Sequence, residues 1–245
     1  GHTAALLSNA CVLGLLIPPS LNQILYAFVA GESVLACFLT TVTPGIMLVI
    51  LLSIVNFWLL RNNTEIKISE NYDFKTTTVL FGKRTLKATP AILCPFIILG
   101  GIYSGAMTPT EAASISVLYA IPVGFFVYRG LNLKGFKGAL LETGTTAGVI
   151  LTMLLSVMIL SRLYVMEDVP LKILNLLTSI SENPAVILIF INIFLIIVGM
   201  IMDDTSAILL TTPILVPVIN AIGVDPVHFS AIVGVNIGMG CITPP

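Results

Sequence analysis

Two adjacent prolines interrupt an apolar segment near the start of the chain, and this feature restricts the possible folds more than any other. The segment covers residues 4–30, and the interruption lies within Gly14–Ser20. Each proline removes a backbone donor and clashes with the preceding turn, so no regular helix passes through them. In a lipid bilayer the freed carbonyl groups would need protein, water or a bound ion as partners. The sequence therefore predicts a broken helix.

The same pattern returns at the end of the chain, in the stretch Gly-Cys-Ile-Thr-Pro-Pro. Aligned without a gap, residues 2–19 and 228–245 are identical at five positions: His2/His228, Ala5/Ala231, Gly14/Gly240, Pro18/Pro244 and Pro19/Pro245. Four of these residues in each copy are glycine, proline or alanine, which affect the backbone conformation and carry no reactive side-chain group. We interpret the two segments as copies of one broken helix, a repeat that is typical of secondary transporters.

Composition indicates a membrane protein. Of the 245 residues, 57% are apolar and only 9% are charged, with a mean hydropathy of +1.06, whereas a soluble domain carries about 25% charged residues. Long apolar runs cover residues 46–60, 139–160 and 185–202. The sequence thus predicts an all-α, multi-pass integral membrane protein. The net charge of −1 gives no indication of nucleic-acid binding.

Motifs for catalysis are missing from the sequence. It contains no His-Glu-x-x-His, no Gly-x-Ser-x-Gly and no phosphate-binding loop, and its two histidines are isolated. Four widely spaced cysteines in apolar surroundings are better explained as small buried hydrophobes than as metal ligands or disulfides: Cys11, Cys37, Cys94 and Cys241. We therefore expect neither enzyme activity nor a cofactor.

The chain divides by composition into four parts. We expect the end of a first repeat at 1–60, with a broken helix at 4–30 and a helix at 44–60, and then a linker at 61–89. Scaffold helices of a second repeat, with a surface arm, are expected at 90–183. The last part, 184–245, should hold a transport-domain helix, a re-entrant hairpin and the start of the second broken helix. The linker holds six of the eleven Lys and Arg residues, so the positive-inside rule places it in the cytoplasm.

An inverted repeat requires an odd number of membrane crossings between His2 and His228. The first broken helix and three apolar runs supply four crossings, so we expect residues 90–128 to cross a net once. This arrangement puts the two basic segments, 61–89 and 129–137, on opposite faces of the membrane. The second of them would then lie outside the cell, against the positive-inside rule.

Asp203 and Asp204 directly follow a membrane span. Ionisable groups at such positions are usually functional, because burying an unpaired charge is costly. We expect one acid to turn inward, with Asp203 the better candidate, and the other to face water. The segment Asp203–Pro217 is too short to cross the membrane twice and has polar residues in its middle. It is therefore predicted to form a re-entrant hairpin buried in protein.

Oxygen ligands for an alkali cation collect around these features. Freed carbonyls of broken helices can coordinate sodium, and five hydroxyl side chains could add to them: Ser8, Ser20, Thr211, Thr212 and Thr243. Helix N-termini after each break present free N–H groups and a positive dipole end, which suit a carboxylate. A cation on carbonyls and an anion on helix N-termini together predict a sodium-coupled importer of organic acids.

Six stretches form a pattern that extends along the chain: Leu13–Ser20, Gly100–Ala113, Gly199–Asp203, Thr212–Pro217, Gly223–Phe229 and Gly240–Pro245. The most specific is the second, Gly-Gly-Ile-Tyr-Ser-Gly-Ala-Met-Thr-Pro-Thr-Glu-Ala-Ala. In sequence and in order they resemble the large membrane subunit of tripartite ATP-independent periplasmic (TRAP) transporters.

The resemblance implies a sodium-driven elevator transporter, in which a mobile domain of hairpins and broken helices slides against a scaffold. It implies two partners, a small membrane subunit and a periplasmic binding protein that delivers C4-dicarboxylates, sialic acid or similar acids. The implied location is the bacterial inner membrane, and the coupling ion is sodium. Two alternatives are a dicarboxylate/sodium symporter that works without a binding protein and a membrane scaffold that does not transport.

In that family, ion sites lie where each hairpin meets its broken helix. Together with the hydroxyl groups above, this assigns sodium binding to Gly14, Ile17, Ser20, Asp203, Thr211, Thr212, Gly240 and Thr243. Substrate binding is expected at Ser8, Pro18, Pro19, Asn22 and Pro244. Asp204 departs from the family pattern, which implies a neutral residue there. Because the chain starts and stops inside broken segments, we expect it to be an internal piece of a longer protein.

Overall fold

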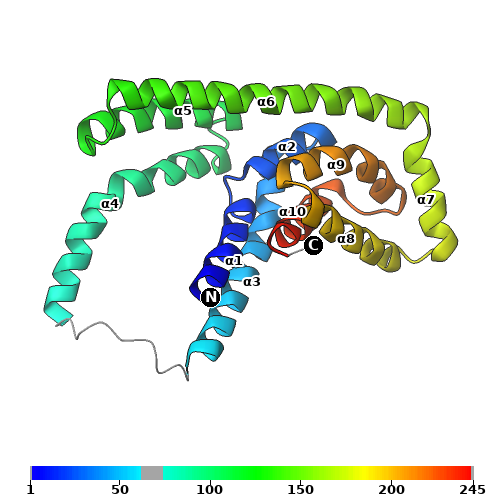
Figure 1. Ribbon diagram of the computed structural model, residues 1–245, viewed down its shortest axis with the longest axis horizontal. Helices are drawn as coiled ribbons and strands as arrows, with labels where there is room; N and C mark the ends of the chain where they lie inside the picture. The colour runs from blue at the N-terminus through cyan, green and yellow to red at the C-terminus, as the bar shows by residue number, and fades with distance from the viewer. Residues whose placement is uncertain (1, 62–73, 244–245) are drawn as a thin grey trace. The chain divides into compact units, whose positions relative to one another are not determined.

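The structure is a computed structural model that describes residues 2–61 and 74–243 (Figure 1). The described residues are helical apart from short turns, as the sequence predicts. In chain order the helices are α1 (His2–Leu16), α2 (Leu21–Ala30), α3 (Val34–Leu60), α4 (Phe74–Tyr103), α5 (Pro109–Pro122), the π-helical η1 (Val123–Val127), α6 (Leu133–Met166), α7 (Val169–Ile180), α8 (Pro184–Ile201), α9 (Asp204–Ala221) and α10 (Pro226–Ile242). They form two compact units, residues 1–52 with 141–245 and residues 53–140.

The helix expected over residues 4–30 is interrupted where the prolines predict. α1 ends at Leu16 and α2 begins at Leu21, and the two helices are bent by 41°. Ile17 still donates its N–H to the carbonyl of Leu13 at 2.8 Å. The two prolines that follow have no N–H to offer the next carbonyls, which is why the helix stops there.

α3 starts ten residues earlier than predicted. We expected a helix over 44–60 opened by Pro44, whereas α3 runs from Val34 to Leu60 and contains that proline. Thr40 and Thr41, in the turn before it, each donate a hydroxyl hydrogen bond to a carbonyl of the preceding turn, at 2.9 and 3.0 Å. The polar residues before Pro44 are therefore part of the helix, because their hydroxyls bond to the helix backbone instead of to water.

Two helices occupy the segment 90–128, where we expected one net crossing. α5 begins with a capping box in which Thr108 and Glu111 bond reciprocally to each other's backbone N–H groups. α4 packs against α5, and the Tyr119 hydroxyl donates to the Pro90 carbonyl at 2.9 Å. Residues 84–103 of α4, and α5 together with η1, are each long and apolar enough to cross a bilayer. The Gly- and Thr-rich stretch ends one helix and starts another, so this segment offers two membrane-length helices, and the single net crossing stays a prediction.

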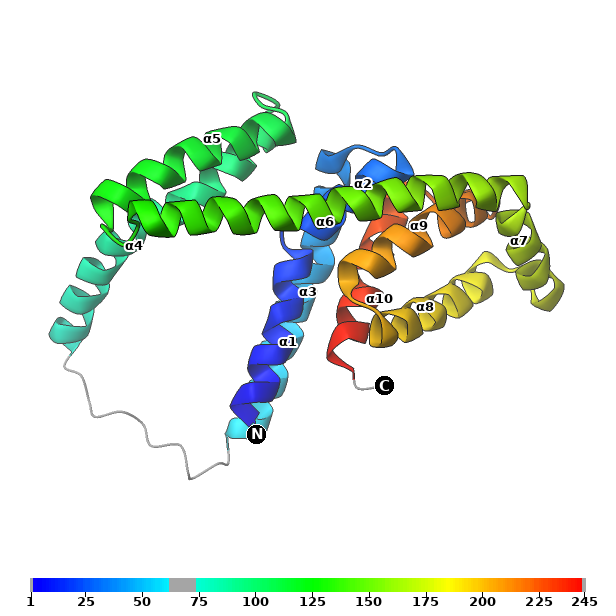
Figure 2. The same cartoon turned by 45° about the horizontal axis from the view of Figure 1, so that its top comes forward.

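α8 and α9 are separated only by Met202 and Asp203 (Figure 2). α9 then continues through Pro213 and Pro217 as one helix. The hairpin expected within 203–217 is therefore wrong, since the turn lies ahead of α9 and not inside it. The two threonines before the first of these prolines donate hydroxyl hydrogen bonds to carbonyls of the preceding turn, at 2.7 and 2.6 Å, so part of the backbone next to the prolines stays hydrogen-bonded.

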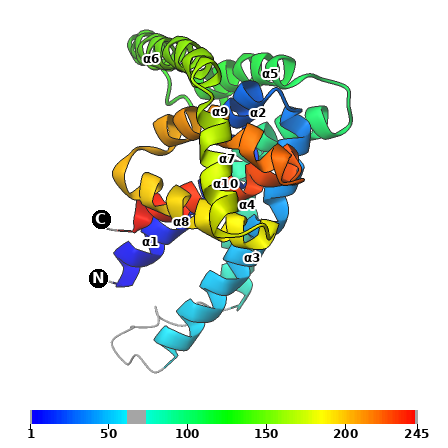
Figure 3. The same ribbon diagram turned by 90° about the vertical axis from the view of Figure 1, so that its right-hand side faces the viewer.

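The core of the first unit forms around α10, which packs against α1, α2, α8 and α9 (Figure 3). α8 and α10 meet closely at Gly199 and Gly240, where a side-chain carbon on Gly240 would lie 2.7 Å from the α-carbon of Gly199. α2 packs on α9, and the Tyr26 hydroxyl donates to the Pro226 carbonyl at 2.7 Å. The buried apolar cluster includes Tyr26, Ile191, Leu195, Ile208, Val218, Phe229 and Ile237.

Six helices of the described residues are long and apolar enough to cross a membrane, and seven spans result if α1 and α2 count as one. α6 is the longest, with 34 residues, none of which is buried. The amphipathic α7 that follows packs against α9 with Ile173, Leu174 and Leu177. An apolar helix without buried residues is expected to face lipid or another protein.

Candidate functional site

Three helix ends meet in the first unit: the start of α2, the start of α9 and the end of α10. The Asn22 amide donates to the Asp204 carboxylate at 2.9 Å, which joins α2 to α9. The end of α10 packs against the end of α8 at Gly240 and Gly199, and α9 begins only three residues after α8 ends. Residues far apart in the sequence thus surround one place, which we take as the candidate site.

Asp203 begins α9 as its N-cap residue. Its carboxylate accepts a hydrogen bond from the backbone N–H of Ser206 at 3.0 Å, so it satisfies one of the free donors of the first turn. Hydrogen bonding, chiefly from the Ser206 side chain, holds the pKa of Asp203 below its ordinary value. The side chain is exposed. The expectation that Asp203 is the inward acid is therefore wrong.

Asp204 is the acid that contacts another helix. Its side chain is half-buried, and its partner Asn22 is only 4% exposed. Ser20, at the N-cap position of α2, does not cap its own helix; its hydroxyl donates to the Leu15 carbonyl at 2.5 Å. The start of α2 is thus held to α1 by one side chain and to α9 by another.

The end of α10 has an oxygen atom, in the Thr243 hydroxyl, that can accept a further partner. The Thr243 hydroxyl donates to the Met239 carbonyl at 2.8 Å, and the Thr243 N–H bonds to the Gly240 carbonyl at 3.0 Å. The hydroxyl oxygen keeps lone pairs for a second partner, and the side chain is exposed. This end of the helix can therefore supply oxygen ligands to a cation.

The structure brings only some of the predicted site residues together. Asn22, Asp203, Gly240 and Thr243 lie at the three helix ends, and Ser20 is the N-cap of α2. Thr211 and Thr212 are buried two turns along α9. Gly14 and the exposed Ser8 belong to α1, while Ile17, Pro18 and Pro19 form the break. Pro244 lies outside the described residues.

Sequence reasoning missed two polar side chains near the break. Asp204 was expected to face water, although its charge next to a span marked it as unusual. Gln23 is 1% exposed; its amide nitrogen donates to the Ser230 carbonyl at 3.2 Å, and its amide oxygen has no partner within the described residues. A glutamine in an apolar run was the only available signal. Within those residues, no group of three His, Cys, Asp or Glu side chains could hold a metal ion.

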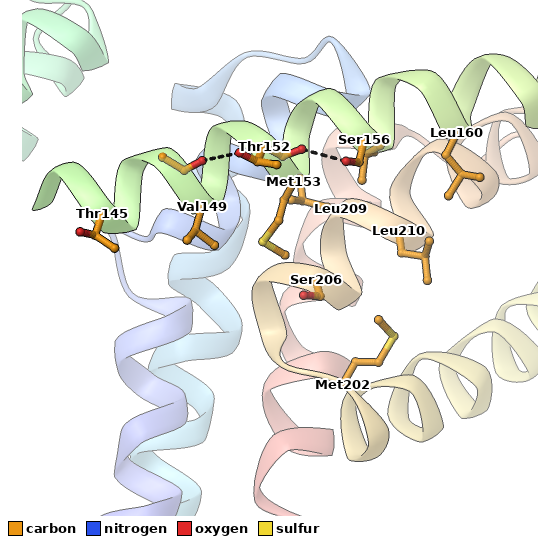
Figure 4. Close-up of a pocket in the computed structure, with 12 residues that line it drawn as sticks. Thr145, Val149, Thr152, Met153, Ser156, Leu160, Met202, Ser206, Leu209 and Leu210 are labelled. Atoms are coloured by element: carbon orange, nitrogen blue, oxygen red, sulfur yellow. Dashed lines mark hydrogen bonds between the residues drawn. The ribbon is translucent and has the colours of Figure 1, made fainter. Parts of the chain in front are cut away.

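An open cavity of about 630 Å³ lies beside the first turns of α9 (Figure 4). Met202, Ser206, Leu209 and Leu210 line one side, and the face of α6 from Thr145 to Leu160 lines the other. The α6 hydroxyls donate to carbonyls of their own helix, as the dashed lines of Figure 4 show for Thr152 and Ser156. The cavity wall is consequently apolar, and it offers no fixed charge to an ion or acid.

A family model described as "Tripartite ATP-independent periplasmic transporter, DctM component" matches residues 1–245. The chain belongs to this family. The resemblance that the six sequence stretches indicated is thus confirmed over the whole chain.

Individual TRAP proteins show the same relationship. The chain is 36% identical to the sialic acid TRAP transporter large permease protein SiaM of Vibrio cholerae, over all of this chain and 55% of that protein. It is 35% identical to the C4-dicarboxylate TRAP transporter large permease protein DctM of Pseudomonas aeruginosa, over 99% of this chain and 56% of that protein. It is 32% identical to the isethionate TRAP transporter permease protein DctMQ of Oleidesulfovibrio alaskensis, over 99% of this chain and 38% of that protein. The chain therefore spans about half the length, or less, of these curated TRAP relatives.

Proposed function

We propose that the protein containing this chain is the large permease subunit of a sodium-coupled TRAP transporter that imports an organic acid through the bacterial inner membrane. A C4-dicarboxylate or an acid of the sialic acid class is the proposed substrate, in line with the names of two relatives. A small membrane subunit and a periplasmic binding protein are the proposed partners. The word "periplasmic" in the family description supports the second of these.

The observation that carries this proposal is the meeting of three helix ends around Asn22 and Asp204. Helix ends expose backbone groups that a continuous span keeps paired. The starts of α2 and α9 offer N–H groups and positive dipole ends to a carboxylate, and the end of α10 offers carbonyls and the Thr243 hydroxyl to a cation. A site with both kinds of group is suited to binding an organic acid and a sodium ion together.

Sodium is proposed as the coupling ion because the site is built from oxygen ligands and carboxylates. Asp203 and Asp204 bring negative charge to the start of α9, which a monovalent cation would offset. No predicted sodium ligand is a nitrogen or sulfur group. Of these ligands, Ser20, Asp203, Gly240 and Thr243 belong to the three helix ends, so we give them priority over Thr211 and Thr212.

The inverted repeat remains part of the proposal, with a revised crossing count. If all six membrane-length helices and the bent α1–α2 pair cross, seven spans separate His2 from His228. Seven is odd, so the two broken segments would run in opposite directions, as an inverted repeat requires. If α8 and α9 instead enter the membrane and return to the same face without crossing it, five crossings remain, and this number is also odd. Elevator-type movement of such a domain is the mechanism that we propose.

Uptake by the full-length parent protein in proteoliposomes tests the function. A radiolabelled acid should accumulate only with an inward sodium gradient, the small membrane subunit and the cognate binding protein. Accumulation without the binding protein would support the symporter alternative, and no accumulation of any organic acid would support the scaffold alternative. Thr243→Ala should raise the sodium concentration for half-maximal uptake, because it removes a hydroxyl ligand. Thr178→Ala, which removes an α7 hydroxyl bonded only within its helix, is the control.

A further inference from the structure

A single side-chain hydrogen bond joins the helix after the proline break to the helix that begins with two acids. The amide nitrogen of Asn22 donates to the Asp204 carboxylate at 2.9 Å, across 182 residues of sequence. Asn22 is 4% exposed and Asp204 is half-buried, so water competes little for the amide. Hydrogen bonds to an ionised partner are about twice as strong as neutral ones.

The two adjacent acids have different partners. Asp203 bonds to the backbone of its own first turn, so it fixes the start of α9 without touching α2. Asp204 bonds to Asn22 of α2 and takes no part in the N-cap of α9, which Asp203 provides. A change at Asp203 should therefore affect one helix, whereas a change at Asp204 should affect the distance between two helices.

The start of α2 lacks the support that most helix starts have. Its N-cap residue Ser20 turns its hydroxyl back to Leu15 and makes no side-chain cap. The break before it removes the backbone hydrogen bonds that would continue α1. Asn22 then joins the first turn of α2 to the start of α9, while the next residue, Gln23, bonds to Ser230 of α10.

We propose that Asn22 and Asp204 act as a positioning pair, which holds the start of α2 at a fixed distance from the start of α9 and so keeps the ion and substrate groups of the site in register. This inference rests on the proposed function. It assigns Asp204 a role that neither the sequence pattern nor the relatives indicate. Neither residue needs to touch the ion or the acid for the pair to act.

Exchanging the two side chains tests the pair. Asn22→Asp alone places two carboxylates against each other and should raise the substrate concentration for half-maximal uptake about tenfold, the loss of roughly one strong hydrogen bond. Asp204→Asn alone keeps a neutral amide bond and should raise it about threefold. The double variant Asn22→Asp/Asp204→Asn restores a charge-assisted bond in the opposite direction, and its value should return to within about twofold of the parent protein.

Asp225→Asn is the matched control. Asp225 caps α10 through the N–H groups of Val227 and His228, and asparagine can keep that cap. It should change neither uptake nor thermal unfolding of the purified parent protein. A double variant that is no better than Asn22→Asp would overturn the pair, as would single variants that lower the unfolding temperature but leave half-maximal uptake unchanged.

The proposed function and the pair can fail separately. If the unaltered parent protein takes up no organic acid under any condition, the proposed function is wrong. The pair is then judged by a second measurement, disulfide formation between Asn22→Cys and Asp204→Cys in native membranes. Rapid cross-linking there, together with recovery of the unfolding temperature in the exchanged double variant, would support the contact; no recovery would refute it.

Discussion

A side-chain carbon on Gly240 would lie 2.7 Å from the α-carbon of Gly199, so these two glycines set how closely α8 and α10 approach. Real side-chain carbons do not come so near to backbone atoms, and backbone cannot move aside as a flexible side chain can. The last turn of α10 therefore depends on small residues in both helices.

Gly240→Ala should lower the free energy of unfolding of the purified parent protein by about 1–3 kcal/mol, because the added methyl group pushes α8 and α10 apart. Thermal unfolding measures the loss. Gly144→Ala is the control, since nothing lies within 4 Å of the carbon it adds to α6. Equal unfolding temperatures for the two variants would contradict the close approach.

The basic segments 61–89 and 129–137 should lie on the same membrane face. α4 and α5 separate them, and two crossings return the chain to its starting side. Nine of the eleven Lys and Arg residues are then on one face, which the positive-inside rule makes cytoplasmic. Single cysteines at Asn63 and Asn132 should react with a membrane-impermeant thiol reagent from that face.

A cysteine at Asn183, after α6, should react from the opposite face. This position is the internal control, because one crossing separates it from Asn132. Labelling of Asn63→Cys and Asn132→Cys from opposite faces would show that α4 and α5 do not both cross, and the original expectation of one net crossing would return.

Asn236 should contribute to the contact between α8 and α10 through its amide. Its nitrogen donates to the Asn192 side-chain oxygen at 2.6 Å and to the Ile232 carbonyl at 2.7 Å. Asn236→Leu and Asn192→Leu, alone and combined, should give a coupling free energy of about 0.6–1.7 kcal/mol in thermal or denaturant unfolding. Strictly additive effects would mean that the contact contributes nothing to stability.

Asp203 should tolerate loss of its charge better than loss of its oxygen. Asp203→Asn keeps an acceptor for the Ser206 N–H, whereas Asp203→Ala removes the cap and should cost about 0.5–2 kcal/mol of stability. If the carboxylate also offsets the charge of a sodium ion, Asp203→Asn should raise the sodium concentration for half-maximal uptake with little change in unfolding temperature. Equal sodium dependence in both proteins would limit Asp203 to capping.

Much of the fold could be predicted from local chemistry. Proline geometry located the break between α1 and α2, and hydropathy identified the membrane-length helices α3, α6 and α8. The mistakes came from prolines too. Pro44 was taken as a helix start, and the segment that ends at Pro217 as a hairpin, whereas the structure keeps Pro44, Pro213 and Pro217 inside helices, with nearby threonine hydroxyls bonded to the backbone. A sequence does not show whether such a side chain will turn toward its own helix.

The candidate site was harder to predict, because it depends on contacts between distant segments. The repeat and the family resemblance directed attention to the two breaks and to Asp203. They did not indicate that Asp204 would bond to Asn22, since that contact depends on how α2 packs against α9. Periodicity predicts which face of a helix is apolar, but not which polar residue on another helix will lie opposite.

The length of α6 exceeds what a bilayer requires. At about 1.5 Å per residue its 34 residues extend roughly 51 Å, whereas the hydrocarbon core is about 30 Å thick. Even a tilt of about 40° leaves roughly 39 Å along the membrane normal. Glu142 and Arg162 lie twenty residues apart in this helix, or about 30 Å, the thickness of that core. If the hydrocarbon core covers the segment between these two charges, the first turns of α6, with the exposed Lys134 and Lys137, extend beyond the lipid into water.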